Sequence, residues 1–374
     1  MINALTIDVE DYFQVHAFSD IIQYENWENY KCRVERNVNR ILEILNDSTH
    51  DSALNTQQFS GPSPHPSPRA PYASVKATFF VLGWIAERYP NLIRKIHAQG
   101  HEIACHGYAH RLIYHQSKEE FRKDIKRAKA ILEDISGIEI SGYRAPSYSI
   151  TNRSQWAFEI LVEEGFKYDS SIFPIKHDFY GMPNAPRFPF LISVNGNSNV
   201  EFSTLSFDLD KTQHSAPMTQ NLRGHGTTAA LDQSVTLNSE LRTMNFIPNA
   251  MHLMPHSPKA NPQSELITPH SILEFPISTV RLLGQNVPIS GGGYFRLFPY
   301  PIVERGLRRI NNQEKEPFIF YIHPWEFDVD QPRFNNGSRL SKFRHYVNLN
   351  KTEGRFKKLL KDFRFSTVRE IIEH

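Results

Sequence analysis

The sequence predicts an α/β fold built mainly on parallel strands, and two observations support this prediction. Short apolar segments alternate along the chain with segments of helical period, which is the rhythm of a mainly parallel sheet or barrel. The chain also has 374 residues, which is enough for a sizeable core in one large domain or two ordinary ones.

Strand signals recur from one end of the chain to the other, each as a short apolar segment. They cover residues 2–8, 75–83, 102–107, 142–145, 166–173, 317–323 and 363–368. Polar-flanked helical segments lie between them, as βα units require.

Two helices can be bounded from the sequence. In "YPNLIRKIHAQG", Pro90 suits the first helical turn and Gly100 suits a C-cap, so a helix is expected over about residues 90–98. A second helix is expected over about residues 118–135. Its apolar residues repeat with helical spacing at Phe121, Ile125, Ala128, Ile131 and Leu132.

Two polar stretches interrupt this rhythm. Residues 47–71 are rich in Ser, Pro and Gln, and residues from about 206 to 270 contain scattered His, Gln, Asn and Ser without a clear period. Such composition is typical of flexible segments at the surface. Because chemical motifs lie on both sides of them, both are expected to be insertions in a single domain over residues 1–374.

Composition excludes several classes of protein. The 42 basic and 40 acidic residues give a formal charge of +2, so no general field attracts nucleic acid or anionic lipid. Two cysteines do not make a disulfide framework. The chain shows neither a signal peptide nor a long apolar span, so a cytoplasmic protein without an integral membrane segment is expected if Met1 is the true start. The sequence leaves the oligomeric state open.

The first predicted strand ends in three carboxylates. "LTIDVEDYF", residues 5–13, brings Asp8, Glu10 and Asp11 together behind an apolar run. Carboxylates this close repel one another and are costly to desolvate. They therefore require a compensating cation, or a catalytic use for a perturbed proton.

A pair of histidines supplies the other part of such a site. "CHGYAH" places His106 and His110 four residues apart, just after a strand, on one side of a helical turn or tight loop. Two imidazoles and one carboxylate are a common ligand set for a catalytic metal with an open position for water. A metal held by these histidines and one acid of "DVED" would leave a second carboxylate free to act as a base.

Three further strand ends carry candidate residues. Arg144 in "SGYRAPSYS" could hold a carboxylate, line a substrate groove or make an ordinary surface ion pair. Asp169 in "YDSSIFP" fits a turn or helix cap equally well. His323 in "FYIHPWEFD" follows an apolar strand, where an imidazole suits either a general acid near neutral pH or a structural role.

Three consecutive glycines, residues 291–293 in "SGGGYFRLFPY", precede aromatic residues. The segment lacks the Gly-Lys-Ser/Thr ending and the following helix of a phosphate-binding loop. We therefore expect close approach of its backbone to a neighbouring strand or to a ligand.

The motifs together resemble those of the NodB-type polysaccharide deacetylases. The resemblance rests on "TIDVEDYF", "ATFFVLGWIAERYPNLIRKIHAQGHEIACHGYAH", "GYRAPSYSI", "YDSSIFP" and "FYIHPWEFD". The branch associated with exosortase-linked exopolysaccharide clusters is the most similar, through "SGGGYFRL" and "FRHYVNLNKTEGRFKKLLKDF". The resemblance covers most of residues 1–190 and 271–374 and implies a deformed (β/α) barrel of about seven strands, with a metal site at the carboxyl ends of the strands.

The resemblance also implies a role for each catalytic candidate. Asp8 is expected to be the general base and His323 the general acid. Asp169 is expected to orient and tune His323, and Arg144 to position the base or the sugar.

The same resemblance makes His106 and His110 metal ligands, with Zn²⁺ as the expected ion. Many relatives carry two adjacent aspartates, base then ligand, whereas here Val9 follows the proposed base. Either Glu10 or Asp11 is therefore expected to reach the metal, and the spacing does not decide between them.

The implied activity is hydrolysis of a linear amide, the removal of N-acetyl groups from amino sugars of an exopolysaccharide or related glycan. The expected partner is therefore an N-acetylated oligo- or polysaccharide. Trp325, Tyr148, Tyr294 and Phe295 could stack on sugar faces or belong to the core. Two alternatives stay open: a barrel hydrolase of a cyclic amide or ureide, and a non-catalytic glycan-binding protein that uses the metal only for structure.

Overall fold

Parallel strands laid side by side form the centre of the structure. The structure is a computed structural model that describes residues 1–48, 74–177, 179–195, 200–204 and 270–373. Neighbouring parallel strands among these residues follow the order β11, β1, β2, β3, β4, β5, β8. Their bounds are β1 Ile2–Val9, β2 Thr78–Val81, β3 Glu102–Cys105, β4 Gly142–Tyr143, β5 Tyr168–Asp169, β8 Ser271–Glu274 and β11 Ile319–Ile322. Consecutive βα units produce this order, so the predicted α/β fold is confirmed.

The remaining strands extend the sheet or stand apart from it. β12 (Arg364–Ser366) pairs in parallel with the start of β1. β6 (Phe190–Val194) and β7 (Val200–Thr204) continue in antiparallel beyond β8, while β9 (Thr279–Leu282) and β10 (Gln285–Pro288) form a separate hairpin. No described ladder joins β8 to β11, so the arrangement is consistent with a deformed barrel that strand pairing does not close.

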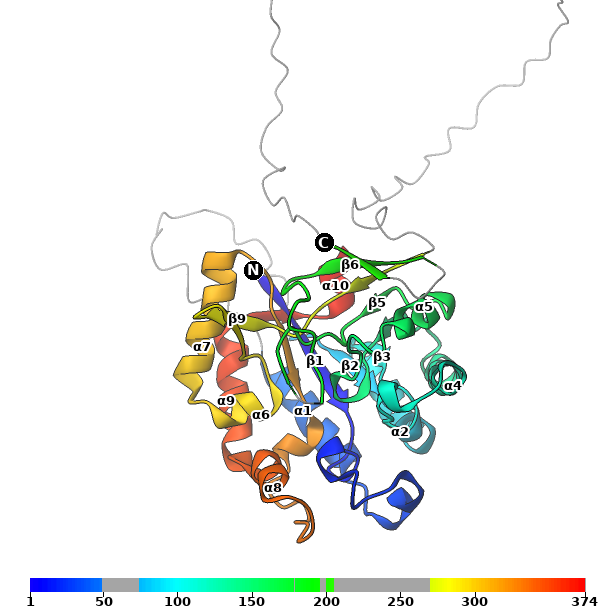
Figure 1. The fold of residues 1–374 in the computed structure, drawn as a ribbon. Helices are drawn as coiled ribbons and strands as arrows, with labels where there is room; N and C mark the ends of the chain where they lie inside the picture. Colours follow the sequence, from blue (N-terminus) through cyan, green and yellow to red (C-terminus); the bar gives the residue numbers. More distant parts are fainter. Residues whose placement is uncertain (49–73, 178, 196–199, 205–269, 374) are drawn as a thin grey trace, which may run out of the picture. The chain divides into compact units, whose positions relative to one another are not determined.

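Helices connect the strands and flank the sheet (Figure 1). Their bounds are α1 Val34–Asp47, α2 Gly83–Arg88, α3 Pro90–Ala98, α4 Lys118–Ser136, α5 Trp156–Glu163, α6 Gly292–Leu297, α7 Tyr300–Arg309, α8 Arg339–Tyr346, α9 Leu349–Asp362 and α10 Val368–Glu373. Both helices that the sequence bounded are confirmed as α3 and α4. α4 starts with a capping box between Ser117 and Glu120 and buries Phe121, Ile125, Ala128 and Leu132.

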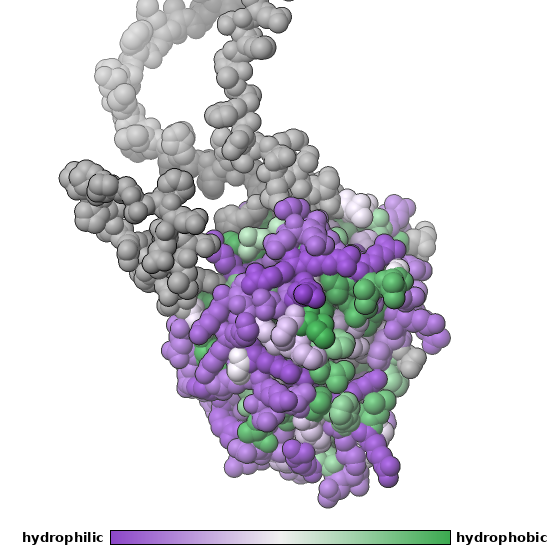
Figure 2. Space-filling model, turned by 90° about the vertical axis from the view of Figure 1, so that its left-hand side faces the viewer, coloured by the Kyte–Doolittle hydropathy of each residue, from purple (hydrophilic) through white to green (hydrophobic). Residues whose placement is uncertain are grey.

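The outer helices are amphipathic. α7 buries Val303 and Leu307, and α9 buries Phe356, Leu359 and Leu360, so their polar sides are left for solvent. On the face drawn in Figure 2, hydrophilic residues predominate and hydrophobic residues form a narrower stretch along one side. Every helix in the described ranges is too short or too polar to span a bilayer.

The segment with glycines 291–293 approaches a neighbouring strand, which was one of the two alternatives expected from the sequence. Gly291 bridges Tyr321 of β11, and a Cβ at Gly291 or Gly292 would collide with that tyrosine. Both glycines also have positive φ, 144° and 50°, where other residues are strained. The expectation that no helix follows is wrong, because α6 begins at Gly292.

The two expected insertions, residues 47–71 and about 206–270, lie almost wholly outside the described residues. Only their borders are visible, at Asp47, the last residue of α1, and at His270, just before β8. That they interrupt a single domain over residues 1–374 stays a prediction.

Candidate metal and catalytic site

The segments that follow β1 and β3 bring three potential metal ligands together. Glu10, His106 and His110 each offer one ligand atom, and these atoms lie within 4.8 Å of one another. Glu10 follows β1 and His106 follows β3, and both strands run parallel to β2 between them. Their carboxyl ends therefore meet at one edge, where barrel enzymes carry their chemistry. His110 has φ of 50°, in a tight turn that leaves its Nε2 2.8 Å from Glu10 Oε2.

The donor atoms of this cluster fit a cation. His106 Nδ1 lies 2.8 Å from the carbonyl oxygen of Arg144. This nitrogen therefore carries the proton and donates, which leaves the Nε2 lone pair free. Burial lowers the pKa of His106 to about 4, which favours the neutral imidazole that metals bind. Glu10 Oε2 is buried and faces His110 Nε2 at 2.8 Å.

Asp11 is not part of the cluster, because its carboxylate holds the start of α1. Asp11 Oδ2 accepts hydrogen bonds from the backbone N–H groups of Arg33 and Val34, at 2.5 and 2.8 Å. Its Oδ1 accepts another from the backbone of Tyr12 at 2.9 Å. These bonds satisfy donors that the first turn of a helix leaves open. Of the two acids that the sequence left open, Glu10 is the one that lies within reach of both histidines.

Asp8 lies beside the cluster in a buried ion pair. Arg144 Nη1 is 2.6 Å from Asp8 Oδ1, and the two side chains are 0% and 3% exposed. Arg144 also donates to the hydroxyl of Thr6 and to the carbonyl and hydroxyl of Ser170. With all these acceptors inside the protein, the guanidinium is fixed and orients the carboxylate. The structure thus places Arg144 against the proposed base, one of the roles expected for it.

His323 reaches the same place from the end of β11. Its Nε2 lies 3.5 Å from Glu10 Oε1 and 3.9 Å from Asp8 Oδ2. Burial would lower the pKa of His323, but the charges of Glu10, Glu326 and Asp8 outweigh this effect and raise the pKa to about 9. The imidazole is therefore protonated near neutral pH, as a general acid must be.

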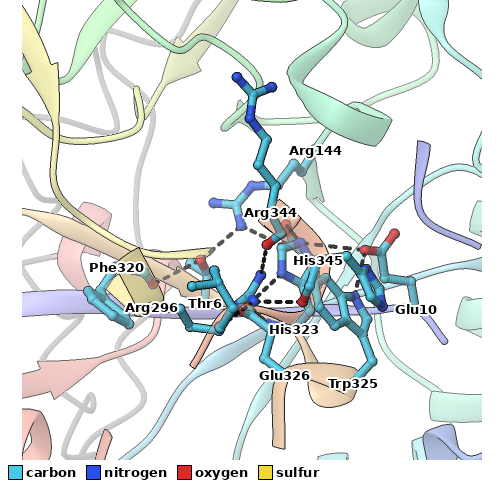
Figure 3. A network of polar contacts seen from close by, with 12 residues as sticks. Thr6, Glu10, Arg144, Arg296, Phe320, His323, Trp325, Glu326, Arg344 and His345 are labelled. Carbon is cyan, nitrogen blue, oxygen red and sulfur yellow. Dashed lines mark hydrogen bonds and ion pairs between the residues drawn. The ribbon is translucent and has the colours of Figure 1, made fainter. Parts of the chain in front are cut away.

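Glu326 is the carboxylate that orients His323. Its Oε1 lies 2.7 Å from His323 Nδ1 and also accepts from the backbone N–H of His323 at 2.9 Å. Its Oε2 accepts from Nε of Arg296 at 2.5 Å, and both side chains are buried. Figure 3 shows this chain of contacts from Arg296 through Glu326 to His323.

The described hydrogen bonds of Asp169 lie with Ser171 and not with His323, so its expected role stays a prediction. Its carboxylate accepts from the backbone and the hydroxyl of Ser171, at 3.0 and 2.6 Å. It also lies opposite Glu274 across β5 and β8, and burial raises the pKa of both carboxyl groups. Asp169 therefore forms a buried acid pair, while Glu326 takes the position next to His323.

Trp325 supports the site and does not form a sugar-stacking surface. Its ring lies between those of His323 and His345, with centroid distances of 5.3 and 4.2 Å. Its Nε1 donates to Glu10 Oε1 at 3.1 Å, so it helps to fix a candidate ligand (Figure 3). Phe295 is fully buried. For these two residues the core alternative holds, whereas the half-buried Tyr294 stays a candidate for sugar contact.

Sequence reasoning missed Glu326 and Arg296. Glu326 stands three residues after His323 in "HPWEF", the spacing of a capping box, and this local signal could have identified it. Arg296 comes from α6 and meets Glu326 only through tertiary structure. No local sequence pattern indicates that Arg296 is a partner of Glu326.

Comparisons with known proteins support the resemblance. Residues 72–162, which include both candidate histidine ligands, match the polysaccharide deacetylase family, and residues 244–373 match a domain of unknown function, DUF3473. The peptidoglycan-N-acetylglucosamine deacetylase of Bacillus cereus is 37% identical over 87 residues, which are 23% of this chain and 32% of that protein. The peptidoglycan deacetylase of Helicobacter pylori is 29% identical over 96 residues, 26% of this chain and 32% of that protein.

The chain spans about a third of the length of these curated relatives. A crystal structure titled as that of a "putative polysaccharide deacetylase" from Mycobacterium smegmatis is similar over 99% of this chain and 88% of that chain, with 16% identity and a TM-score of 0.48. Through residues 72–162, the chain is similar to the polysaccharide deacetylase family.

Proposed function

We propose that this protein is a metal-dependent hydrolase that removes N-acetyl groups from the amino sugars of an exopolysaccharide or a related glycan. One observation carries the proposal: an oriented carboxylate, Asp8, and a protonated imidazole, His323, lie beside the same set of potential ligands. A base, an acid and a ligand set are the groups that metal-assisted amide hydrolysis requires.

Glu10, His106 and His110 would hold the divalent ion. Two imidazoles and one carboxylate are a set that Zn²⁺ uses in catalytic sites, so Zn²⁺ is the expected ion. When bound, such an ion polarises an amide carbonyl and lowers the pKa of a water molecule.

Asp8 accepts the proton of the attacking water. Its Oδ1 is held by Arg144 at 2.6 Å, while its Oδ2 faces His323 Nε2 at 3.9 Å. Because the Arg144 guanidinium is completely buried and bonded to Thr6 and Ser170 as well, it does not reach out to a sugar. Its role is to fix the direction of the base.

His323 donates a proton to the nitrogen of the departing amino sugar. Without that proton the amine is a poor leaving group, and the tetrahedral adduct returns to the amide. Glu326 holds the Nδ1–H at 2.7 Å, which aims the other ring nitrogen, Nε2, at the reacting groups. The products are acetate and a free amino sugar within the glycan.

The test is acetate release from N-acetylhexosamine oligomers by the purified protein with added Zn²⁺. His106→Ala and His110→Ala are expected to lose both the metal and turnover, because each removes one donor. His323→Ala is expected to keep the metal and lose about 10²- to 10⁴-fold in kcat, the usual contribution of a general acid. His97→Ala, at a half-buried position on α3, controls for loss of an imidazole.

Two results would contradict the proposal. An unchanged kcat for His323→Ala would remove the assigned acid. Metal binding without acetate release from any N-acetylated oligomer would favour the alternatives, and hydrolysis of a small cyclic amide or ureide would then separate another barrel hydrolase from a binding protein.

A further inference from the structure

Two tyrosine hydroxyls are buried without a hydrogen-bond partner among the described residues. They belong to Tyr143 and Tyr148, whose residues are 0% and 6% exposed. Buried polar groups are normally paired, and an orphan in a native fold requires an explanation. The two tyrosines lie in different surroundings, which allows a comparison between them.

Tyr143 belongs to the general core between the sheet and its helices. Its ring packs edge-on against Phe121 of α4 and against Phe166, with centroid distances of 5.9 and 5.5 Å. Both partners belong to the main apolar cluster of the protein. Its unpaired hydroxyl has no connection with the proposed catalytic groups.

Tyr148 lies beside Arg144, which holds Asp8, within a second apolar cluster that includes Phe173 and Tyr321. Its ring centroid lies 5.8 Å from the Arg144 guanidinium and 5.2 Å from the ring of Tyr321, which in turn lies 5.7 Å from His323. After burial, the charge of Asp8 is the largest cause that raises the pKa of Tyr148. The hydroxyl therefore stays protonated and is able to donate.

The backbone at Tyr148 is also strained. Ser147 and Tyr148 have φ of 52° and 55°, two consecutive left-handed residues that are not glycine. Such conformations are sparsely populated and collect at functional sites. One residue thus combines an unfavourable backbone, an unpaired hydroxyl and a ring near Arg144, the residue that holds the proposed base.

We propose that the Tyr148 hydroxyl donates a hydrogen bond to the acetamide oxygen of the substrate as negative charge develops on that oxygen. This inference rests on the proposed function and adds a donor from the protein to it. A donor fixed in a buried site needs no reorganisation during the reaction, which is why such groups stabilise oxyanions effectively. Its lack of a partner in the protein leaves it free to serve the substrate.

The test compares Tyr148→Phe with Tyr143→Phe, since each removes one unpaired buried hydroxyl and nothing else. Tyr148→Phe is expected to lower kcat about 100-fold with little change in KM, because the bond is made mainly in the transition state. Its Tm should equal or exceed that of the wild type, since no hydrogen bond within the protein is lost. Tyr143→Phe should show the same Tm behaviour and the wild-type kcat.

Three results would overturn the inference. These are a wild-type kcat for Tyr148→Phe, a rise in KM alone, or a fall in kcat that comes with a lower Tm or a displaced pH profile. The last would mean that the substitution disturbs Asp8 or His323. Acetate release by the wild type and by Tyr143→Phe tests the proposed function separately, because the inference concerns only the ratio between the two variants.

Discussion

The contact between Glu326 and His323 leads to a prediction whose size can be worked out. Glu326→Gln keeps the shape of the side chain and removes its charge. In the structure this charge lies 2.7 Å from His323 Nδ1 and 2.5 Å from Arg296 Nε. The substitution therefore leaves both cations without their nearest counter-charge, in a region where all three side chains are mostly buried.

The charge of Glu326 contributes to the raised pKa of His323, which is about 9. A hydrogen bond to a charged group is worth about 1.5–3 kcal/mol, and 1.36 kcal/mol corresponds to one pKa unit. Removing the charge should lower the pKa of His323 by about 1–2 units. Since the reaction needs protonated His323, the alkaline limb of the kcat profile should move down by the same amount.

The same substitution should also destabilise the fold. Breaking a buried ion pair by removing one partner costs about 3–5 kcal/mol. Arg296 keeps hydrogen bonds to the carbonyl oxygens of Arg344, His345 and Val347, so the lower end of this range is expected.

The assays are kcat from acetate release between pH 6 and 11, and urea unfolding at pH 7. The control is Glu353→Gln, which removes the same charge from an ion pair with Arg40 that is partly exposed. It should cost less than about 1 kcal/mol and leave the pH profile in place. An alkaline limb that stays where it is in Glu326→Gln would refute the assigned role of Glu326.

Three further predictions concern the ligands and the frame. Glu10→Gln should weaken Zn²⁺ binding more than about 100-fold, whereas Asp11→Asn should keep the affinity within tenfold and lose about 1–3 kcal/mol of stability; calorimetric titration and urea unfolding would expose an exchange of these roles. Burial lowers the pKa of His101 to about 4. The contribution of its neutral ring to the free energy of unfolding is therefore fully present above about pH 6.5, and about 3 kcal/mol of it is lost as pH falls toward 4. His101→Gln should flatten this part of the stability curve, and an unchanged slope would contradict the assignment. Gly291→Ala should cost at least about 2 kcal/mol because its Cβ meets the backbone of β11, while Gly284→Ala, with positive φ but open space around it, should cost less; equal unfolding midpoints would refute the steric argument.

Many of the helices and strands could be predicted because their sequence signals are local. The period of apolar residues, Pro90 and Gly100 predicted α3. Apolar runs predicted strands that do pair, and all of these strands except β1 are shorter than the runs. The strands are shorter than the apolar runs because a residue belongs to a strand only where it pairs with the backbone of a neighbouring strand. In the expected strand 166–173, only Tyr168 and Asp169 are paired.

The choice between Glu10 and Asp11 could not be made from the sequence. Both residues follow the end of β1 at Val9, so the alternation of side chains along a strand does not apply to them. The cap that Asp11 provides for α1 could not be predicted, because Arg33 and Val34 lie beyond a long loop.

In the structure, the carboxylate next to His323 Nδ1 is that of Glu326. Asp169 ends β5, whereas Glu326 lies in the turn directly after β11. Because Glu326 is only three residues from His323 in the chain, local backbone geometry is enough to bring the two side chains into contact. Glu274 also meets Asp169 through the pairing of β5 with β8, which no pattern within either segment reveals.

The central claim is that Glu10, His106 and His110 bind one divalent ion beside Asp8 and His323. Its most direct test is anomalous diffraction at the zinc edge from crystals of the Zn²⁺-loaded protein. The account predicts one strong peak about 2.0–2.2 Å from a nitrogen of each histidine and an oxygen of Glu10. A loaded crystal with no peak there, or with the ion bound to Asp11 instead of Glu10, would contradict it.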